Sequence, residues 1–225
     1  RHTVLHMQML LGEAGPTPLE HIFDFIEAAE VVIVMFVNRF WSEVASSDAV
    51  WSAQCRRLWA DKVYVPARFT LPALRRIEAY WRSLADAKRT AITAEELCGF
   101  EWSSRMKGWA GTDWTTNDPW WHSPPGTPVI KKYFVDGTTS SSRGDGTWRF
   151  VPSSCGRSGP LGCFVRHARG SVEFPTHFVS RWAPNWGWIL QNCWGFSASF
   201  ELPPRGSVPE LEDDEALCQS VTVQT

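Results

Sequence analysis

The chain has 225 residues and a mass of 25.5 kDa, with 44% hydrophobic and 20% charged residues, which is typical of a water-soluble globular protein of one or two domains. Its 22 Lys and Arg and 24 Asp and Glu give a formal net charge of -2. The positive charge that drives most nucleic-acid binding is therefore absent, and we expect no nucleic-acid partner. The longest apolar run, VVIVMFV, is too short to cross a bilayer as a helix, so no membrane association is expected either.

The cysteines indicate the compartment. The 6 Cys are scattered without a CxxC spacing, and a chain of this length does not need disulfides to stabilise its core. We therefore expect reduced thiols and a location in the cytoplasm or the nucleus. The chain begins at Arg1 rather than Met, which leaves open an upstream segment.

Residues 17–98 carry the spacing of helices. Apolar residues recur every three to four positions over 17–29, and Thr17 with Glu20 has the spacing of a capping box. We expect a second, buried short helix over 31–40 and a third that begins after the cap at 46–48. An amphipathic helix is predicted over 71–89, and a short one follows the capping-box spacing of Thr93 and Glu96 and stops at Gly99.

After residue 99 the apolar period becomes two, and Gly, Pro, Ser and Asp interrupt it every few residues. This pattern predicts about eight antiparallel strands that form a barrel or a sandwich, with neighbouring strands paired as a meander. The expected strands are 100–107, 129–135, 147–151, 163–167, 171–174, 177–182, 186–191 and 193–200. The predicted class is α+β, with an N-terminal tail (1–15), a helical domain (16–60), a helical linker (61–98), a Trp-rich β domain (99–203) and an acidic disordered tail (204–225).

Four segments of the helical domain follow one hydrophobic spacing pattern. Segment 19–27 (LEHIFDFIE) resembles Leu-x-x-Ile-Phe-x-Phe-Leu, and 30–32 (EVV) stands at an acidic-Leu-Leu step. Segment 37–41 (VNRFW) resembles Val-Cys-Arg-x-Trp, and 45–51 (ASSDAVW) resembles Ala-Ser-Asp-x-x-Leu-Trp. In these segments the helical domain resembles an F-box, the adaptor motif of cullin-based ubiquitin ligases. Two departures are visible: Pro16 is one position out of register with the leading Leu-Pro, and Asn38 replaces the Cys.

The resemblance implies a partner, a Skp-type linker protein whose C-terminal helices interleave with the F-box and connect it to cullin and RING subunits. The linker contacts that it implies are Pro16, Leu19, Ile22, Ile26, Val31 and Val37. Trp41 and Trp51 are expected to hold the three helices together. A physical argument agrees, because about 40 residues are near the lower limit for folding alone, and an apolar excess suggests that a partner completes the core. The alternative is that all these side chains are internal core.

The β domain would then select the client protein, and several of its segments are similar to plant and algal F-box proteins. The chain has 14 Trp, most of them after residue 100, and Trp and Arg are frequent in binding hot spots. Most of these Trp are expected to fill the barrel. Exposed loop residues often bind partners, so the predicted client contacts are Trp109, Trp114, Trp120 and Trp121, together with Arg149, Arg166 and Arg181 if strand register brings them together to read an acidic or phosphorylated motif.

Two other functions are compatible with the sequence. Gly146-Thr147-Trp148 matches the Gly-x-Trp of lipocalins, which suggests a barrel that binds a small ligand. A structural subunit of a larger assembly is the third possibility.

The sequence contains no catalytic constellation. Cys163, His167 and His177 could converge on a metal, but scattered core cysteines and hydrogen-bonded histidines explain them better than a metal site does. The sequence therefore predicts a non-enzymatic adaptor without cofactor or metal.

Overall fold

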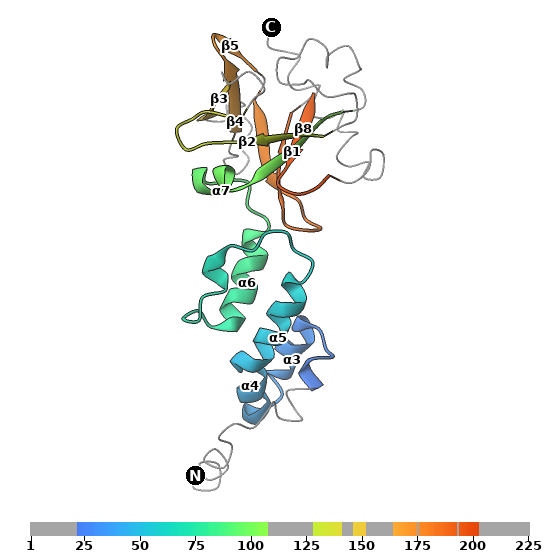
Figure 1. The fold of residues 1–225 in the computed structure, drawn as a ribbon. Coiled ribbons are helices and arrows are strands. Elements are labelled where there is room, and N and C mark those ends of the chain that lie inside the picture. The colour runs from blue at the N-terminus through green and yellow to red at the C-terminus, as the bar shows by residue number, and fades with distance from the viewer. Residues whose placement is uncertain are drawn as a thin grey trace. The chain divides into compact units, whose positions relative to one another are not determined.

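The structure, a computed structural model, describes residues 22–107, 128–140, 146–151, 164–174, 176–192 and 194–202. The chain divides into two compact units, a helical unit that ends at Asp86 and a sheet unit that starts at Ala87 (Figure 1). Each unit has its own hydrophobic core. The predicted α+β class is confirmed.

The described part of the helical unit consists of short helices. In chain order they are α3 (Ala28–Val34), α4 (Arg39–Ala45), α5 (Asp48–Trp59), the 3-10 helix η1 (Ala67–Phe69) and α6 (Arg76–Asp86). α5 begins where the sequence predicts, because the Ser47 side chain accepts a hydrogen bond from the backbone N of Val50 at 3.4 Å. α6 lies inside the range predicted for the amphipathic helix, and the Asp48 carboxylate of α5 accepts from its first backbone N at 2.9 Å.

The helix predicted over 17–29 is interrupted. Within its described part Ile22 and Phe23 are helical, a turn and a bend over 24–26 follow, and residues 28 and 29 already belong to α3. Side chains of α5 satisfy the carbonyls that this break releases: Gln54 Nε2 donates to the oxygens of Phe23 (3.1 Å) and Ile26 (3.2 Å). Hydrogen bonds from α5 therefore stabilise the end of this helix. The spacing of apolar residues along the sequence carries no information about such long-range contacts.

The single buried helix predicted over 31–40 was also wrong. The segment contains α3 and the start of α4, separated by a turn at 35–38. Asn38 has an extended backbone and accepts from the backbone N of Trp41 at 3.1 Å, so it caps α4 and ends the continuity with α3. Most of this segment is not buried, since Val31 alone between residues 31 and 40 is in the buried class.

Two tryptophans hold the helical unit together, as predicted. Trp51 is fully buried, and its Nε1 donates to the carbonyl oxygen of Ala45 at 2.8 Å, which ties α5 to the end of α4. Trp41 packs against the same core, with its ring centroid 6.2 Å from that of Phe23 in an edge-on arrangement. Tyr80 of α6 contacts Trp51 edge-on, with ring centroids 5.2 Å apart.

The sheet unit opens with α7 (Ala94–Gly99), where the predicted capping box is present: Thr93 Oγ1 accepts from the N of Glu96, whose carboxylate accepts from the N of Thr93. Each of the predicted strands overlaps an observed one. They are β1 (Glu101–Met106), β2 (Val129–Lys132), β3 (Gly146–Val151), β4 (Phe164–Arg169), β5 (Val172–Glu173), β6 (His177–Arg181), β7 (Trp188–Gln191) and β8 (Gly195–Ala198).

All eight strands belong to one antiparallel sheet, with the order β2-β1-β8-β7-β6-β4-β3 and β5 on the edge of β4. The meander prediction holds for the consecutive pairs β1–β2, β3–β4, β4–β5, β6–β7 and β7–β8. It fails at β2–β3 and β5–β6, which form no strand pair within the described residues; instead β4 pairs with β6, and β1 pairs with β8. A buried hydrogen bond of 2.6 Å between the hydroxyls of Ser104 and Ser197 joins these two strands. No local pattern marks a pairing over this sequence distance.

The sheet is curled (Figure 1). Tyr133, which follows β2, has its ring 5.9 Å from that of Trp102 on β1 and 5.3 Å from that of His167 on β4, although four steps of the strand order separate β1 and β4. Isolated bridges from Thr138 to Thr147 and from Tyr133 to Thr139 also link the β2 edge with the β3 edge. Of the two predicted architectures, this single barrel-like sheet is closer to a barrel than to a sandwich of two sheets.

We call the face that carries Trp102, Leu190 and Val179 the inner face, because register places them on one side and all three are fully buried. The opposite, outer face is covered in part as well. Ile189, Phe196 and Ala198 form a small second core there with Leu202 and neighbouring rings. No helix within the described ranges is long and apolar enough to cross a membrane.

Candidate functional site

Large apolar side chains are exposed at the start of the helical unit. Between residues 22 and 40, six of them are between 54% and 86% exposed to solvent. We call them the exposed apolar set: Ile22, Phe25, Ile33, Phe36, Val37 and Phe40. Single exposed apolar residues are normal, but a concentration of this size in 19 residues is typical of a surface that binds a partner.

The short helices explain why these side chains stay outside. α3 begins at Ala28 because the Glu30 carboxylate accepts from the backbone N of Glu27 at 2.9 Å, and it ends only seven residues later. A helix of two turns buries one stripe, and in α3 the buried positions are Ala28 and Val31. The remaining apolar positions of the run must therefore face outward or lie at the margin of the core.

The predicted linker contacts fall into three groups. Pro16 and Leu19 lie outside the described residues. Ile22 and Val37 are exposed, and Ile26 is half-buried against the core. Val31 is 0% exposed and packs inside the helical unit, where a partner has no access to it in this conformation. The alternative of a purely internal core does not describe Ile22 and Val37.

Four members of the exposed apolar set were not among the predicted contacts: Phe25, Ile33, Phe36 and Phe40. The signal for two of them, Ile33 and Phe36, was present in the sequence. The segment 31–37 is apolar at every position, and one face of a short helix cannot bury seven consecutive apolar residues. The prediction of one buried helix over 31–40 overlooks this limit, because one face of a short helix accommodates only part of the run.

Acidic residues accompany the exposed apolar set. Residues 22–55 contain five acidic residues (Asp24, Glu27, Glu30, Glu43 and Asp48) and one basic residue, Arg39, a net charge of -4. Arg39 is itself paired with Glu43 at 2.9 Å. A partner that covers this region is therefore expected to be apolar at its centre and basic at its rim.

In the sheet unit, the predicted client contacts do not form one site. Trp109, Trp114, Trp120 and Trp121 all lie outside the described residues. Arg149 and Arg166 are register partners on the outer face, and both pair with Glu173 of β5, Arg166 at 2.9 Å. Arg181 is on the inner face, buried, with its guanidinium carbon 4.8 Å from the Trp188 ring centroid. The strand register therefore brings together two of the three arginines and separates the third.

The inner face also holds a histidine pair. His167 Nε2 is 2.9 Å from the Tyr133 hydroxyl, and the rings of His167 and His177 are 4.7 Å apart. Burial, with a smaller effect of the Lys131 charge, lowers the pKa of His177 from 6.5 to about 3. Burial also holds the pKa of His167 well below its ordinary value, with smaller effects of His177 and Lys131. Both rings are therefore neutral at pH 7.

The surroundings of the two histidines are those of a packed core. His177 Nε2 is 3.3 Å from the Asn192 side-chain nitrogen, and Tyr133, whose pKa burial raises above 10, stays a neutral hydrogen-bonding group. Cys163, the third member of the metal site considered from the sequence, lies outside the described residues. Within the ranges that the structure describes, no three His, Cys, Asp or Glu side chains are grouped to hold a metal ion.

Comparisons with known proteins give no independent identification. No family model matches the chain, and neither a curated protein nor a solved structure matches it significantly.

Proposed function

We propose that the chain is a substrate-recognition adaptor of a cullin-RING ubiquitin ligase, in which the helical unit binds a Skp-type linker. The observation that supports this proposal is the exposed apolar set, six large side chains within the segment that resembles an F-box. An interleaved linker would remove these side chains from water, and the area term alone would favour binding by about 25 cal/mol for each Å² of apolar surface. Catalysis then belongs to other subunits.

The solvent exposure of the side chains changes which residues we propose as linker contacts. Phe25 and Phe36 become the principal anchors because they are the most exposed members of the set, and Ile22 and Val37 remain contacts. Val31 supports the site from within the core. Asn38, which replaces the family Cys, caps α4 and so fixes the direction in which Phe40 leaves the turn.

The sheet unit is the proposed client-binding part. Its client remains unidentified, and the Trp-rich segment around Trp120 and Trp121 is the first region to mutate when a client is known. Arg149 and Arg166 already share the Glu173 carboxylate, so an acidic or phosphorylated client group would have to compete with this residue.

The test is direct binding between the purified chain and a purified Skp-type linker, measured by calorimetry and size-exclusion chromatography. We expect a one-to-one complex. Replacing Phe25 and Phe36 with Ser should weaken it more than tenfold, because truncation of a buried aromatic anchor typically costs about 2 kcal/mol or more. Val63→Ser is the matched control, since Val63 is an exposed apolar residue of the same unit outside the set.

Two results would contradict the proposal: no complex at micromolar concentrations, or equal affinities for the Phe variant and the wild type.

A lipocalin-like ligand barrel ranks second because the described inner face is already filled by rings of its own. Among them are Trp102, Tyr133 and Trp188, all essentially inaccessible to solvent. It predicts a saturable change in Trp fluorescence with an apolar small molecule. A structural subunit predicts a fixed partner outside the ubiquitin system.

A further inference from the structure

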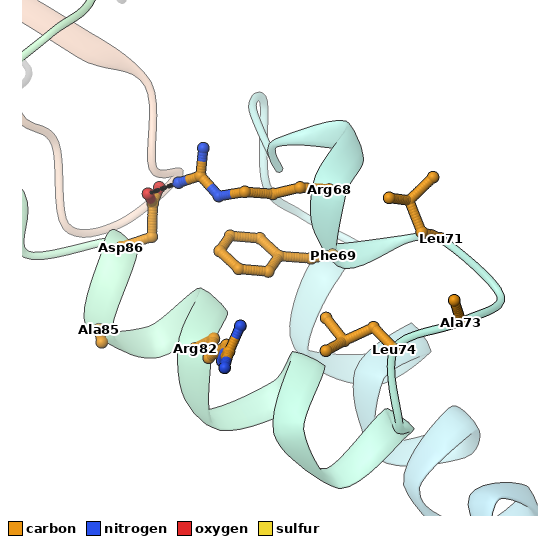
Figure 2. Close-up of a pocket in the computed structure, with 8 residues that line it drawn as sticks. All are labelled: Arg68, Phe69, Leu71, Ala73, Leu74, Arg82, Ala85 and Asp86. Carbon is orange, nitrogen blue, oxygen red and sulfur yellow. Dashed lines mark hydrogen bonds and ion pairs between the residues drawn. The ribbon is translucent and has the colours of Figure 1, made fainter.

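A pocket of about 480 Å³ lies in the helical unit, between η1 with the turn after it and the second half of α6 (Figure 2). Its lining is mixed. The apolar members are Phe69, Leu71, Ala73, Leu74 and Ala85, and the charged members are Arg68, Arg82 and Asp86. The volume lies within the range of about 300–1,000 Å³ that is typical of ligand sites.

The pocket is built on fixed elements. Phe69 is buried and packs with Cys55 and Ala79, so its ring forms a rigid floor. Arg76, the first residue of α6, donates to the carbonyl oxygen of Phe69 at 3.3 Å and thereby holds η1 against the helix. The Leu74 N donates to the Leu71 oxygen at 3.2 Å, which closes the turn at the pocket's edge.

The charged groups at the rim are positive in sum. Arg68 pairs with Asp86, whose side chain is almost completely buried, while the Arg68 side chain remains half-exposed. Arg82 is 62% exposed and pairs with Glu78, which is itself partly exposed and does not line the pocket. Water screens such an exposed ion pair, and its arginine can exchange partners at little cost.

The charge of the surrounding chain has the same sign. Residues 56–86 contain seven basic residues and three acidic ones, a net charge of +4. Residues 22–55 of the same unit have a net charge of -4, and the whole chain has -2. The pocket therefore lies in the basic part of a unit whose other part is acidic, and its field favours anionic ligands.

We propose that this pocket is a docking site for a peptide segment of a partner protein, in which one large apolar residue is flanked by acidic residues. The apolar side chain would lie on Phe69 and Leu74, and the flanking carboxylates would meet the guanidinium groups of Arg68 and Arg82. The proposal uses different residues from the exposed apolar set and does not depend on linker binding. It adds a second interaction site to the chain.

The experiment uses the full chain and a fluorescein-labelled acidic peptide, Glu-Glu-Leu-Glu-Glu, read by fluorescence anisotropy at low salt. A peptide with Lys in place of Glu and one with Ser in place of Leu are the reference probes. We expect saturable binding of the acidic Leu peptide, weaker binding at high salt, and at least fivefold weaker binding of both reference peptides.

Substitutions locate the site. Arg82→Glu should weaken the acidic peptide about fivefold or more, because an exposed attraction becomes a repulsion. Arg39→Glu is the matched control: Arg39 is 93% exposed and pairs with a carboxylate one turn away on α4, as Arg82 does on α6. Leu71→Ser should also weaken binding, and Val63→Ser, which changes a residue of similar exposure outside the pocket, should not.

Three outcomes would overturn the proposal: no preference for the acidic peptide, equal losses in Arg82→Glu and Arg39→Glu, or equal binding of the Leu and Ser peptides, which would indicate a site for small anions only. Circular dichroism of each variant separates loss of binding from loss of folding. Because no linker is present, failure here leaves the linker experiment intact, and failure of linker binding leaves this result intact.

Discussion

The two units of this protein differ in which side chains they expose and bury. Among the described residues, the helical unit exposes more large apolar side chains, such as Phe25 and Phe36, and the sheet unit buries more polar ones, such as Arg105, His167 and Ser104. Exposed apolar surface is stabilised when a partner covers it, while buried polar groups are stable only when hydrogen bonds satisfy them. The exposed apolar side chains of the helical unit support the linker binding proposed for it, and the buried polar side chains of the sheet unit make its fold depend on internal hydrogen bonds.

The largest expected effect tests whether the sheet unit depends on its inner rings. Trp102 is fully buried, and its Nε1 donates to the Leu97 oxygen at 2.9 Å. Trp102→Ala should lower the free energy of unfolding by about 3–5 kcal/mol, the usual cost of removing a buried aromatic ring. Urea unfolding measures the loss. Trp81→Ala, which removes a half-exposed ring from the helical unit, is the control and should cost less.

Acid should destabilise the sheet unit through its histidine pair. The folded-state pKa values of His167 and His177 are depressed, so both rings stay neutral in the fold while the unfolded chain binds protons below pH 6.5. The neutral rings contribute their full share to the free energy of unfolding above pH 6.5. This contribution is lost as the pH falls from 6.5 toward the folded-state pKa, which is about 3 for His177. The loss is roughly 1.4 kcal/mol per pH unit for each ring.

The measurement is the free energy of unfolding between pH 7 and pH 4.5, followed in the wild type and in His177→Gln. The variant should lose stability less steeply over this window, because one depressed group is absent. Identical slopes in the two proteins would contradict a His177 that stays neutral in the fold.

A smaller effect is expected at the bond between β1 and β8. Ser197→Ala leaves the buried Ser104 hydroxyl without its partner and should cost about 1–3 kcal/mol. The double variant, with Ala at both positions, should recover part of this loss, since neither polar group then remains. A double-mutant cycle by chemical denaturation gives the coupling energy, and a value of zero would show that this hydrogen bond does not specify the pairing.

The smallest effect on stability is expected in the exposed apolar set. Phe36→Ser should change the free energy of unfolding by less than about 0.5 kcal/mol, because its side chain contributes little to the core. Val31→Ala, five residues away and fully buried, should cost about 1–2 kcal/mol. Thermal unfolding of the isolated chain compares them, and equal losses would mean that Phe36 is a core residue.

Much of the secondary structure was predictable because its signals are local. The caps at Ser47 and Thr93 place hydroxyls within hydrogen-bond reach of the first turn of their helices, so a few adjacent residues decide where α5 and α7 begin. The alternation after residue 99 likewise located the strands. The break before α3 was not predictable, since it depends on Gln54 and Arg57 from a helix far along the chain.

The candidate sites show the same division. The sequence indicated that the segment 19–41 carries an apolar excess, but it could not say which side chains face water, because that depends on where each short helix ends and what packs on it. Thus Val31 became core and Phe36 became surface. The pocket at Phe69 had no sequence signal, since its walls come from η1 and α6 and meet only in the fold.

By itself the sequence determined the class, the strands, two helix caps and the chemical character of each region, all of which depend on residues within a few positions of one another. The tertiary structure alone decided the β1–β8 pairing, the separation of Arg181 from Arg149, and the contact of the buried His167 with His177. These features depend on contacts between residues far apart in the chain, whose geometry is set when the sheet curls and the helices pack, and not by local conformational preference.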